Sequence, residues 1–219
     1  TPTYIVDYIV RQTVGKLLDD CARRREPAHS FPPAEKDQSG LTSAATVEKA
    51  DLRRAAAVLN RVAKLRILDP ACGSGSFLMG AYQYLLDWHL QFYLAHNPAH
   101  WAKGGRPALV QTAKGWQLTI AERKRILLAN LYGVDIDAQA VEVTKLSLLL
   151  KVLEGETGQT LQTIFRLFAE RALPDLGNNI KCGNSLIGPD FYQQAELPEL
   201  TDEERYRINV FDWHAEFPE

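Results

Sequence analysis

Residues 67–78 read I-L-D-P-A-C-G-S-G-S-F-L, and this short stretch decides the expected fold. The apolar residues at its start are typical of a buried strand, and the proline and two glycines after Asp69 indicate a tight turn. Apolar residues at helical spacing then continue to about residue 95. A strand, a glycine-bearing turn and a helix together form the unit on which nucleotide-like ligands commonly bind.

Two further stretches predict strands of the same kind. One, N-L-Y-G-V-D, ends at Asp135 and precedes a predicted helix over about 138–153; the other, N-I-K-C-G-N, ends at Asn184. Because strands and helices alternate, the strands are expected to pair in parallel. The predicted fold class is therefore α/β, with a Rossmann-like doubly wound parallel sheet. Three strands make about half of such a sheet.

The chain divides into three expected regions. Residues 1–64 form an N-terminal helical segment with a proline-rich loop at about 26–46, expected to be mobile. Residues 65–189 form the α/β region that carries the glycine-bearing turn, with a largely helical insertion at about 90–129. Residues 190–219 hold two basic and nine acidic residues and form an acidic tail.

Local signals set the expected helix ends. Thr1 reads as an N-cap with Pro2 at the first helical position, which starts a helix that reaches about residue 25. Thr119 with Glu122 predicts a capping box, for a helix that ends near Ala129. Residues 96–118 read as irregular, and a helix is expected over about 160–171.

Composition bounds the class of protein. The chain has 219 residues, of which 46% are hydrophobic and 24% charged, with a net charge of −2. These values are those of an ordinary globular domain, and no apolar run approaches the ~18 residues of a membrane span. Cys21, Cys72 and Cys182 are widely spaced and read as reduced thiols of a cytoplasmic protein, with neither a disulfide framework nor a metal site. The chain starts without Met, as a fragment or a processed product does.

The residues of the turn select among ligands. A phosphate loop needs G-x-x-x-x-G-K-[ST], which the sequence lacks, and the dinucleotide pattern G-x-G-x-x-G has Leu78 at its third position. Asp69 at the mouth of the turn would repel a pyrophosphate. A ligand with positive groups and no phosphate suits this place better than a dinucleotide does, and S-adenosylmethionine is such a ligand.

Polar residues after the other two strands extend this hypothesis. Asp135 ends a strand where a carboxylate accepts both hydroxyls of a ribose, and Ile136 beside it offers an apolar face to adenine. Asn184 reaches the same edge, where its amide can read the N6 amino group of adenine and a ring nitrogen together. In the alternative interpretation Asp135 and Asp137 both cap the next helix, an interpretation favoured for Asp137. Asn184 equally suits a plain G-N turn.

Four blocks in this order resemble the motif set of adenine-N6 DNA methyltransferases. They are T-P-T-Y-I-V-D-Y-I-V, L-D-P-A-C-G-S-G-S-F-L, L-Y-G-V-D-I-D-A-Q-A-V and I-K-C-G-N-S-L-I-G, about 45 positions between residues 1 and 188. The likeness is to the large methyltransferase modules of type IIG restriction–modification enzymes and related phage-defence methylases. The likeness implies a cofactor pocket. Near the methionine carboxylate it places Thr1 and Pro2, with Thr3 and Tyr4 close by, and around the rest of the methionine it places Asp69, Ala71, Gly73 and Gly75. It implies further that Asp135 binds the ribose, that Ile136 packs on adenine and that Asn184 reads the adenine.

Three departures from the family pattern bear on these roles. The first two strand ends are 66 residues apart, against ~20 in a minimal fold, which the insertion explains. Asn184 stands where an aspartate is more usual. The catalytic block N-P-P-[YFW] does not occur in the 219 residues, so no catalytic residue is assigned in this chain. That block is expected beyond Glu219.

The expected function follows from the resemblance. The chain is expected to be the S-adenosylmethionine-binding part of a site-specific DNA methyltransferase that modifies adenine N6 in a restriction–modification or phage-defence system. It is expected to be inactive alone, to meet duplex DNA through other parts and to work with C-terminal catalytic and target-recognition regions of the same protein. The alternatives are an RNA or protein-glutamine methyltransferase, a non-catalytic cofactor-binding module, and a dinucleotide oxidoreductase, against which Asp69 and Leu78 argue.

Overall fold

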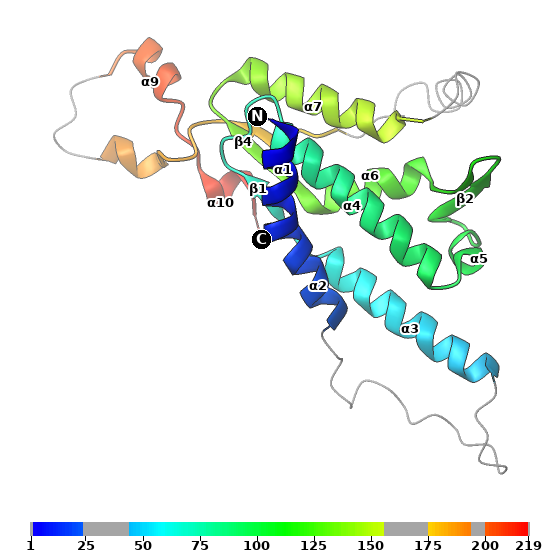
Figure 1. Cartoon of the computed structure of the whole chain (residues 1–219). Coiled ribbons are helices and arrows are strands. Elements are labelled where there is room, and N and C mark those ends of the chain that lie inside the picture. Colours follow the sequence, from blue (N-terminus) through cyan, green and yellow to red (C-terminus); the bar gives the residue numbers. More distant parts are fainter. Residues whose placement is uncertain (1, 24–43, 156–174, 194–199, 219) are drawn as a thin grey trace.

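A parallel three-stranded sheet forms the centre of the computed structural model, which describes residues 2–23, 44–155, 175–193 and 200–218 (Figure 1). Its strands β1 (Ile67–Asp69), β4 (Leu131–Asp135) and β5 (Ile180–Cys182) lie in the order β1-β4-β5. Ile67 pairs with Leu131 and Gly133 with Ile180. The α/β class and the parallel pairing of the three predicted strands are thus confirmed.

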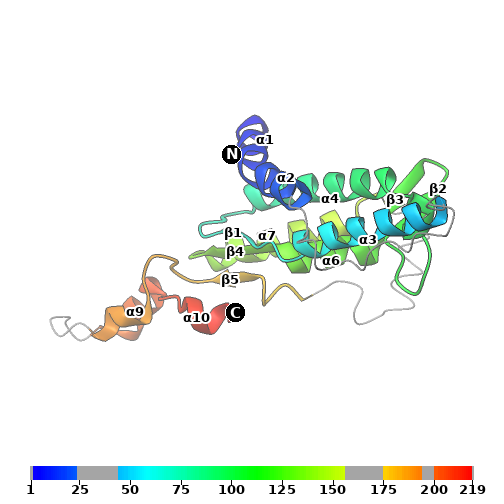
Figure 2. The same ribbon diagram turned by 90° about the horizontal axis from the view of Figure 1, so that it is seen from below.

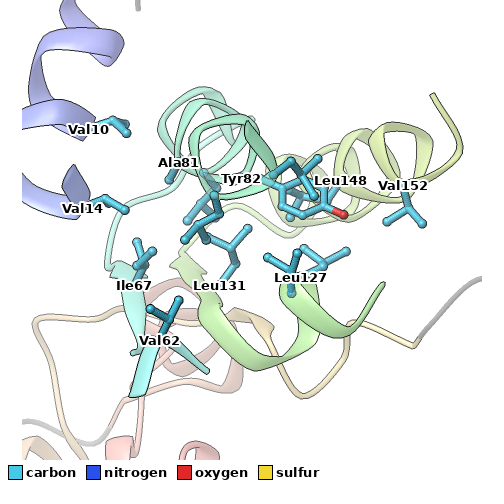
Figure 3. Packing of buried hydrophobic residues seen from close by; sticks show 14 of the residues in the cluster. Val10, Val14, Val62, Ile67, Ala81, Tyr82, Leu127, Leu131, Leu148 and Val152 are labelled. Atoms are coloured by element: carbon cyan, nitrogen blue, oxygen red, sulfur yellow. The ribbon is translucent and has the colours of Figure 1, made fainter. Parts of the chain in front are cut away.

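Three helices carry the core against this sheet: α4 (Ser76–Ala95), α6 (Ile120–Asn130) and α7 (Ala138–Leu153). Each helix buries apolar side chains in one cluster with the strand residues Ile67 and Leu131, and Figure 3 shows Tyr82, Leu127 and Leu148 among them. Gly133 in the central strand allows α4 to approach closely, since a Cβ there would lie 2.8 Å from Leu78 Cδ1. The limits predicted for α4 and α7 are confirmed.

The N-terminal segment lies across α4 (Figures 1 and 2). It runs through α1 (Thr3–Val10), a π-helical turn η1 (Arg11–Gly15) and α2 (Lys16–Arg23), and α2 meets α3 (Ala44–Val62). Its inner face buries Val6, Val10, Val14 and Leu18, whereas Tyr4, Ile5, Tyr8, Ile9 and Leu17 are exposed. Pro2 occupies the N-cap of α1 and not the predicted first helical position. Thr1 and the proline-rich loop lie outside the described residues.

The insertion contains regular structure that the sequence did not predict. Residues 96–118, expected to be irregular, hold the short helix α5 (Pro98–Trp101) and an antiparallel hairpin of β2 (Leu109–Thr112) and β3 (Gly115–Leu118). A two-residue turn closes the hairpin: Lys114 N donates to Thr112 Oγ1 at 3.2 Å, and Gly115 has a φ of 103°. The expectation of an irregular stretch was wrong.

The predicted capping box at Thr119 is only half present. Thr119 Oγ1 accepts from Glu122 N at 3.2 Å, so it is the N-cap of α6. The Glu122 carboxylate turns inward instead, where it accepts from Tyr93 Oη at 2.6 Å and from Arg125 Nε at 2.9 Å. The start of α6 is therefore fixed by the hydrogen bond to Thr119 alone, and the Glu122 carboxylate belongs to a buried network.

The C-terminal residues lie on the other side of the sheet from α4, as Figure 2 shows for α10. They form η3 (Pro189–Gln193), α9 (Asp202–Ile208) and α10 (Trp213–Glu216). Lys181 of β5 pairs with Glu216 at 2.7 Å, and the ring of Tyr132 meets Phe217 edge-on. Beside α10 is a hollow of about 790 Å³. The helix predicted over about 160–171 lies outside the described residues.

A buried histidine next to the Glu122 network makes the fold sensitive to acid. His89 is fully buried on α4, its Nδ1 lies 2.8 Å from Leu85 O, and its Nε2 has no hydrogen-bond partner among the described residues. Burial lowers the pKa of His89 to about 4. Burial alone would raise the pKa of Glu122, but the hydrogen bonds and charge of Arg125 outweigh it and lower that pKa.

We therefore expect the free energy of unfolding to fall as the pH drops below 6.5. His89 stays neutral in the folded protein while the unfolded chain takes up a proton, so the loss from this residue alone approaches roughly 3 kcal/mol at pH 4. Urea unfolding at pH 7, 5.5 and 4 measures it. His89→Leu should flatten the slope between pH 6.5 and 4.5; an unchanged slope in that variant would contradict the assignment.

Candidate functional site

The carboxyl edge of the sheet gathers the polar residues that end its strands. Asp69 lies beside Gly133, Asp135 lies beside Cys182, and Asn184 follows two residues after the end of β5. Burial raises the pKa of Asp69, and the negative charge of Asp135 adds to that rise. The two predicted carboxylates are thus near enough to repel each other, at the edge where parallel α/β sheets bind their ligands.

Hydrogen bonds from both side chains and backbone groups hold the glycine-bearing turn between β1 and α4. Ala71 N donates to Asp69 Oδ1 at 3.2 Å, and Cys72 N donates to Val134 O at 2.9 Å. Gly73 and Gly75 have φ values of 53° and 81°, a region that side-chain-bearing residues rarely adopt. Because Gly75 has this conformation, α4 begins directly at Ser76, and no side chain caps its first turn. The turn thus presents helix amides on the same edge as the carboxylates.

Asp135 does more than sequence reasoning assigned to it. Its Oδ2 accepts from Gly73 N at 2.7 Å, across 62 residues of chain, and its Oδ1 accepts from Asp137 N at 3.0 Å. A carboxylate offers about four acceptor positions, so two remain for a ligand. Asp137 is the N-cap of α7, where its side chain accepts from Gln139 N at 2.8 Å, as predicted. Of the two aspartates, only Asp137 acts as the helix cap.

The two residues expected at the adenine are placed differently from each other. Ile136 follows Asp135 with half of its surface exposed, which leaves an apolar side chain open at the edge. Asn184 Oδ1 accepts from Leu186 N at 3.1 Å, and Asn184 N donates to Asn209 O at 2.7 Å. The side-chain oxygen of Asn184 thus stabilises a local turn, as in the alternative interpretation of this residue.

Of the N-terminal residues expected near the methionine, Thr3 lies close to the glycine-bearing turn. Thr3 lines a hollow of about 520 Å³ between α1 and α4 together with Ser76, the residue after Gly75. Tyr4 is 74% exposed, and Pro2 is exposed as well. The hollow includes none of the strand-end residues Asp69, Asp135 and Asn184. The N-terminal block therefore reaches the helix side of the turn through Thr3.

Sequence reasoning missed Thr144 on α7. This residue is fully buried, and its Oγ1 donates to Gly73 O at 2.8 Å. The other buried residues of α7 are Val141, Leu148 and Val152. A single hydroxyl within an apolar helical stripe is the sequence signal that points to such a contact.

Cys72 lies within the turn and is buried. Burial, followed by the charges of Asp69 and Asp135, raises the pKa of its thiol to about 11. A thiol with that pKa is almost entirely protonated at neutral pH and is a poor nucleophile. Cys72 therefore serves packing beneath the turn.

The described residues hold neither a cluster of metal-binding side chains nor a helix that could cross a membrane. No group of three or more His, Cys, Asp and Glu side chains within residues 2–23, 44–155, 175–193 and 200–218 is arranged to hold a metal ion. None of the helices in these same ranges is both long and apolar enough to span a bilayer.

Comparison with known proteins places most of the chain in one family. Residues 43–206 match the family described as MmeI, DNA-methyltransferase domain. A relative from Methanocaldococcus jannaschii, named as a type II restriction enzyme and methyltransferase, is 32% identical over 213 residues, 94% of this chain and 16% of its own length. The type II restriction enzyme and methyltransferase RM.Eco57I of Escherichia coli is 31% identical over 67% of this chain and 13% of its own.

A third relative is named more narrowly. The adenine-specific methyltransferase BrxX of Escherichia coli O9:H4 (strain HS) is 24% identical over 160 residues, which cover 68% of this chain and 10% of that protein. The chain thus spans between a tenth and a sixth of the length of these relatives.

Proposed function

The chain belongs to the family of the MmeI DNA-methyltransferase domain, and on this premise we propose that it is the S-adenosylmethionine-binding part of a DNA methyltransferase that modifies adenine N6. The observation that carries the proposal is the family match over residues 43–206. The names of the relatives support the reaction and a restriction–modification setting.

The carboxyl edge fits the cofactor chemically. Asp69 offers a carboxylate to the ammonium of the methionine, where a pyrophosphate would be repelled. A Cβ added at Gly73 would meet no atom within 4 Å, so the turn leaves room for a ligand beside its backbone. Asp135 keeps two acceptor positions for the ribose hydroxyls, and Ile136 offers an apolar surface to adenine. S-adenosylmethionine, when bound, supplies the methyl group on its sulfonium.

The remaining assigned residues have supporting roles in this proposal. Gly75 and Ala71 shape the backbone along the methionine, and Thr3 approaches it from α1. We also assign Thr1, Pro2 and Tyr4 to the methionine side. Asn184 holds the loop after β5 through its side-chain oxygen, which leaves its amide nitrogen for the adenine ring.

The architecture proposed for the whole protein is a class I methyltransferase with a Rossmann-like doubly wound sheet. In it, residues 65–189 bind the cofactor, residues 1–64 form a helical cover, and residues 190–219 lead toward the catalytic block. Because the relatives are six to ten times longer than the matched part, we place target recognition, the grip on duplex DNA and the flipping of the adenine in other parts of the protein.

Methyl transfer by the whole protein tests this function. With tritiated S-adenosylmethionine and duplex DNA, digestion to nucleosides should give labelled N6-methyladenine. Asp69→Ala should lower the label, and label at the wild-type level in this variant would indicate a contaminating activity. Label on cytosine, RNA or protein would overturn the substrate but keep the cofactor; no binding of S-adenosylmethionine would overturn both.

A further inference from the structure

Two side chains clamp the backbone of Gly73 at both ends. Its N–H donates to Asp135 Oδ2 at 2.7 Å, and its carbonyl oxygen accepts from Thr144 Oγ1 at 2.8 Å. Asp135 ends β4 and Thr144 lies within α7, so the turn between β1 and α4 is fixed by the next strand and helix. With both peptide groups of Gly73 held, the direction of the following backbone is determined.

Thr144 also packs against the second glycine of the turn. A Cβ added at Gly75 would lie 2.8 Å from Thr144 Cγ2 and 2.9 Å from Thr144 Oγ1. One side chain therefore contacts the turn at Gly73 by a hydrogen bond and at Gly75 by van der Waals packing. Within the turn, these are the two positions where φ is positive.

The hydroxyl is not used in the way that is usual for a helical threonine. A threonine inside a helix commonly donates to the carbonyl three or four residues earlier, as Thr13 does to Ile9 O at 2.8 Å. Thr144 instead donates across 71 residues to a different element. It is fully buried, and valine would fill nearly the same space.

We propose that Thr144 is a positioning residue for the cofactor: by holding the Gly73 carbonyl it sets the turn against which S-adenosylmethionine binds. The proposal rests on the function proposed above and adds a residue on α7 that does not face the ligand. Without the hydroxyl, the Gly73 carbonyl loses this donor and faces an apolar side chain in a part-buried place, so the peptide gains by rotating away. The turn then presents the wrong backbone surface to the methionine.

The test compares Thr144→Val and Thr144→Ser in the whole protein, with Val152→Ala as a matched control. Val152 is equally buried on α7 but lies two turns further along, near the end of the helix. Calorimetry should show that Thr144→Val weakens S-adenosylmethionine binding about five- to tenfold, as expected for one net hydrogen bond. Thr144→Ser, which keeps the hydroxyl, should stay within about twofold of the wild type.

Kinetics and thiol labelling separate positioning from a loss of stability. Thr144→Val should raise the KM for S-adenosylmethionine and leave kcat near the wild-type value at saturating cofactor. It should also speed alkylation of Cys72, followed by peptide mass spectrometry, because Cys72 lies beneath the turn. Val152→Ala should lower the melting temperature without either effect.

The outcomes decide the proposal. If the wild type binds S-adenosylmethionine and Thr144→Val binds it with the same affinity, the role of Thr144 is overturned and the proposed function is kept. The same holds if Val152→Ala weakens binding as much, or if Thr144→Ser fails to restore it. No binding by the wild type would overturn the proposed function itself.

Discussion

Gly75→Ala should abolish S-adenosylmethionine binding by the whole protein, with an expected loss of a hundredfold or more. The φ of 81° at this position disfavours any residue with a Cβ by about 1–2 kcal/mol. The added methyl would also press on Thr144, and overpacking of this kind costs about 1–3 kcal/mol. Relief of both requires that the turn move, together with the start of α4. Calorimetric titration of the variant measures the loss.

Two other glycines separate the causes. Gly115 in the hairpin has a φ of 103°, but a Cβ there would meet no atom within 4 Å, so Gly115→Ala reports conformational strain without a collision. A Cβ added in Gly73→Ala would likewise meet no atom within 4 Å, but Gly73 belongs to the proposed site. We expect Gly115→Ala to bind cofactor normally. If Gly75→Ala bound as well as Gly115→Ala, the close packing of Thr144 on the turn would be disproved.

Asp135→Ala is expected to have the second-largest effect. The substitution removes the acceptors of Gly73 N and Asp137 N as well as the proposed ribose contacts. Hydrogen bonds to a charged group contribute roughly 1.5–3 kcal/mol, which corresponds to a ten- to hundredfold weaker cofactor affinity. Asp135→Asn keeps one acceptor oxygen and should fall between the wild type and the alanine variant. Equilibrium binding of S-adenosylmethionine measures all three.

Asp137→Ala is the matched control, because it removes a carboxylate two residues away. It deletes the N-cap of α7 and should cost about 1 kcal/mol of unfolding free energy with little change in affinity. If Asp137→Ala bound the cofactor more weakly than Asp135→Ala, the ribose role would have been assigned to the wrong aspartate.

The parts of the fold that the sequence predicted are those with local causes. The strand before Asp69, the cap at Asp137 and the limits of the two long helices all follow from residues within a few positions of each other. The resemblance to methyltransferases of restriction–modification systems also lies in contiguous motifs, and the family match confirms it.

The hairpin escaped prediction because its signal is weak in isolation. Its turn is Ala113-Lys114, followed by Gly115, and lacks the Asn-Gly or Asp-Gly pair that marks two-residue turns. The hydrogen bond from Lys114 N to Thr112 Oγ1 supplies part of what those residues provide. Such a side-chain contribution is not visible in a pattern of apolar residues.

Contacts between distant segments account for the rest. The second role of Asp135 and the whole role of Thr144 depend on a turn that lies 62 and 71 residues earlier. Periodicity does not distinguish the buried face of α1 either, since Val6 and Val10 point inward while Ile5 and Ile9 are exposed and equally apolar. Which face is covered depends on where α4 lies, and no local pattern contains that information.

The position of the hairpin has a practical consequence for labelling. It lies at the far end of α4 from the glycine-bearing turn in both views, and a helix of 20 residues spans roughly 30 Å (Figures 1 and 2). Ala113 and Lys114 at its tip are exposed. A fluorophore or an affinity tag inserted between them would sit away from the sheet edge, so that the protein can be labelled or immobilised without a change at that edge.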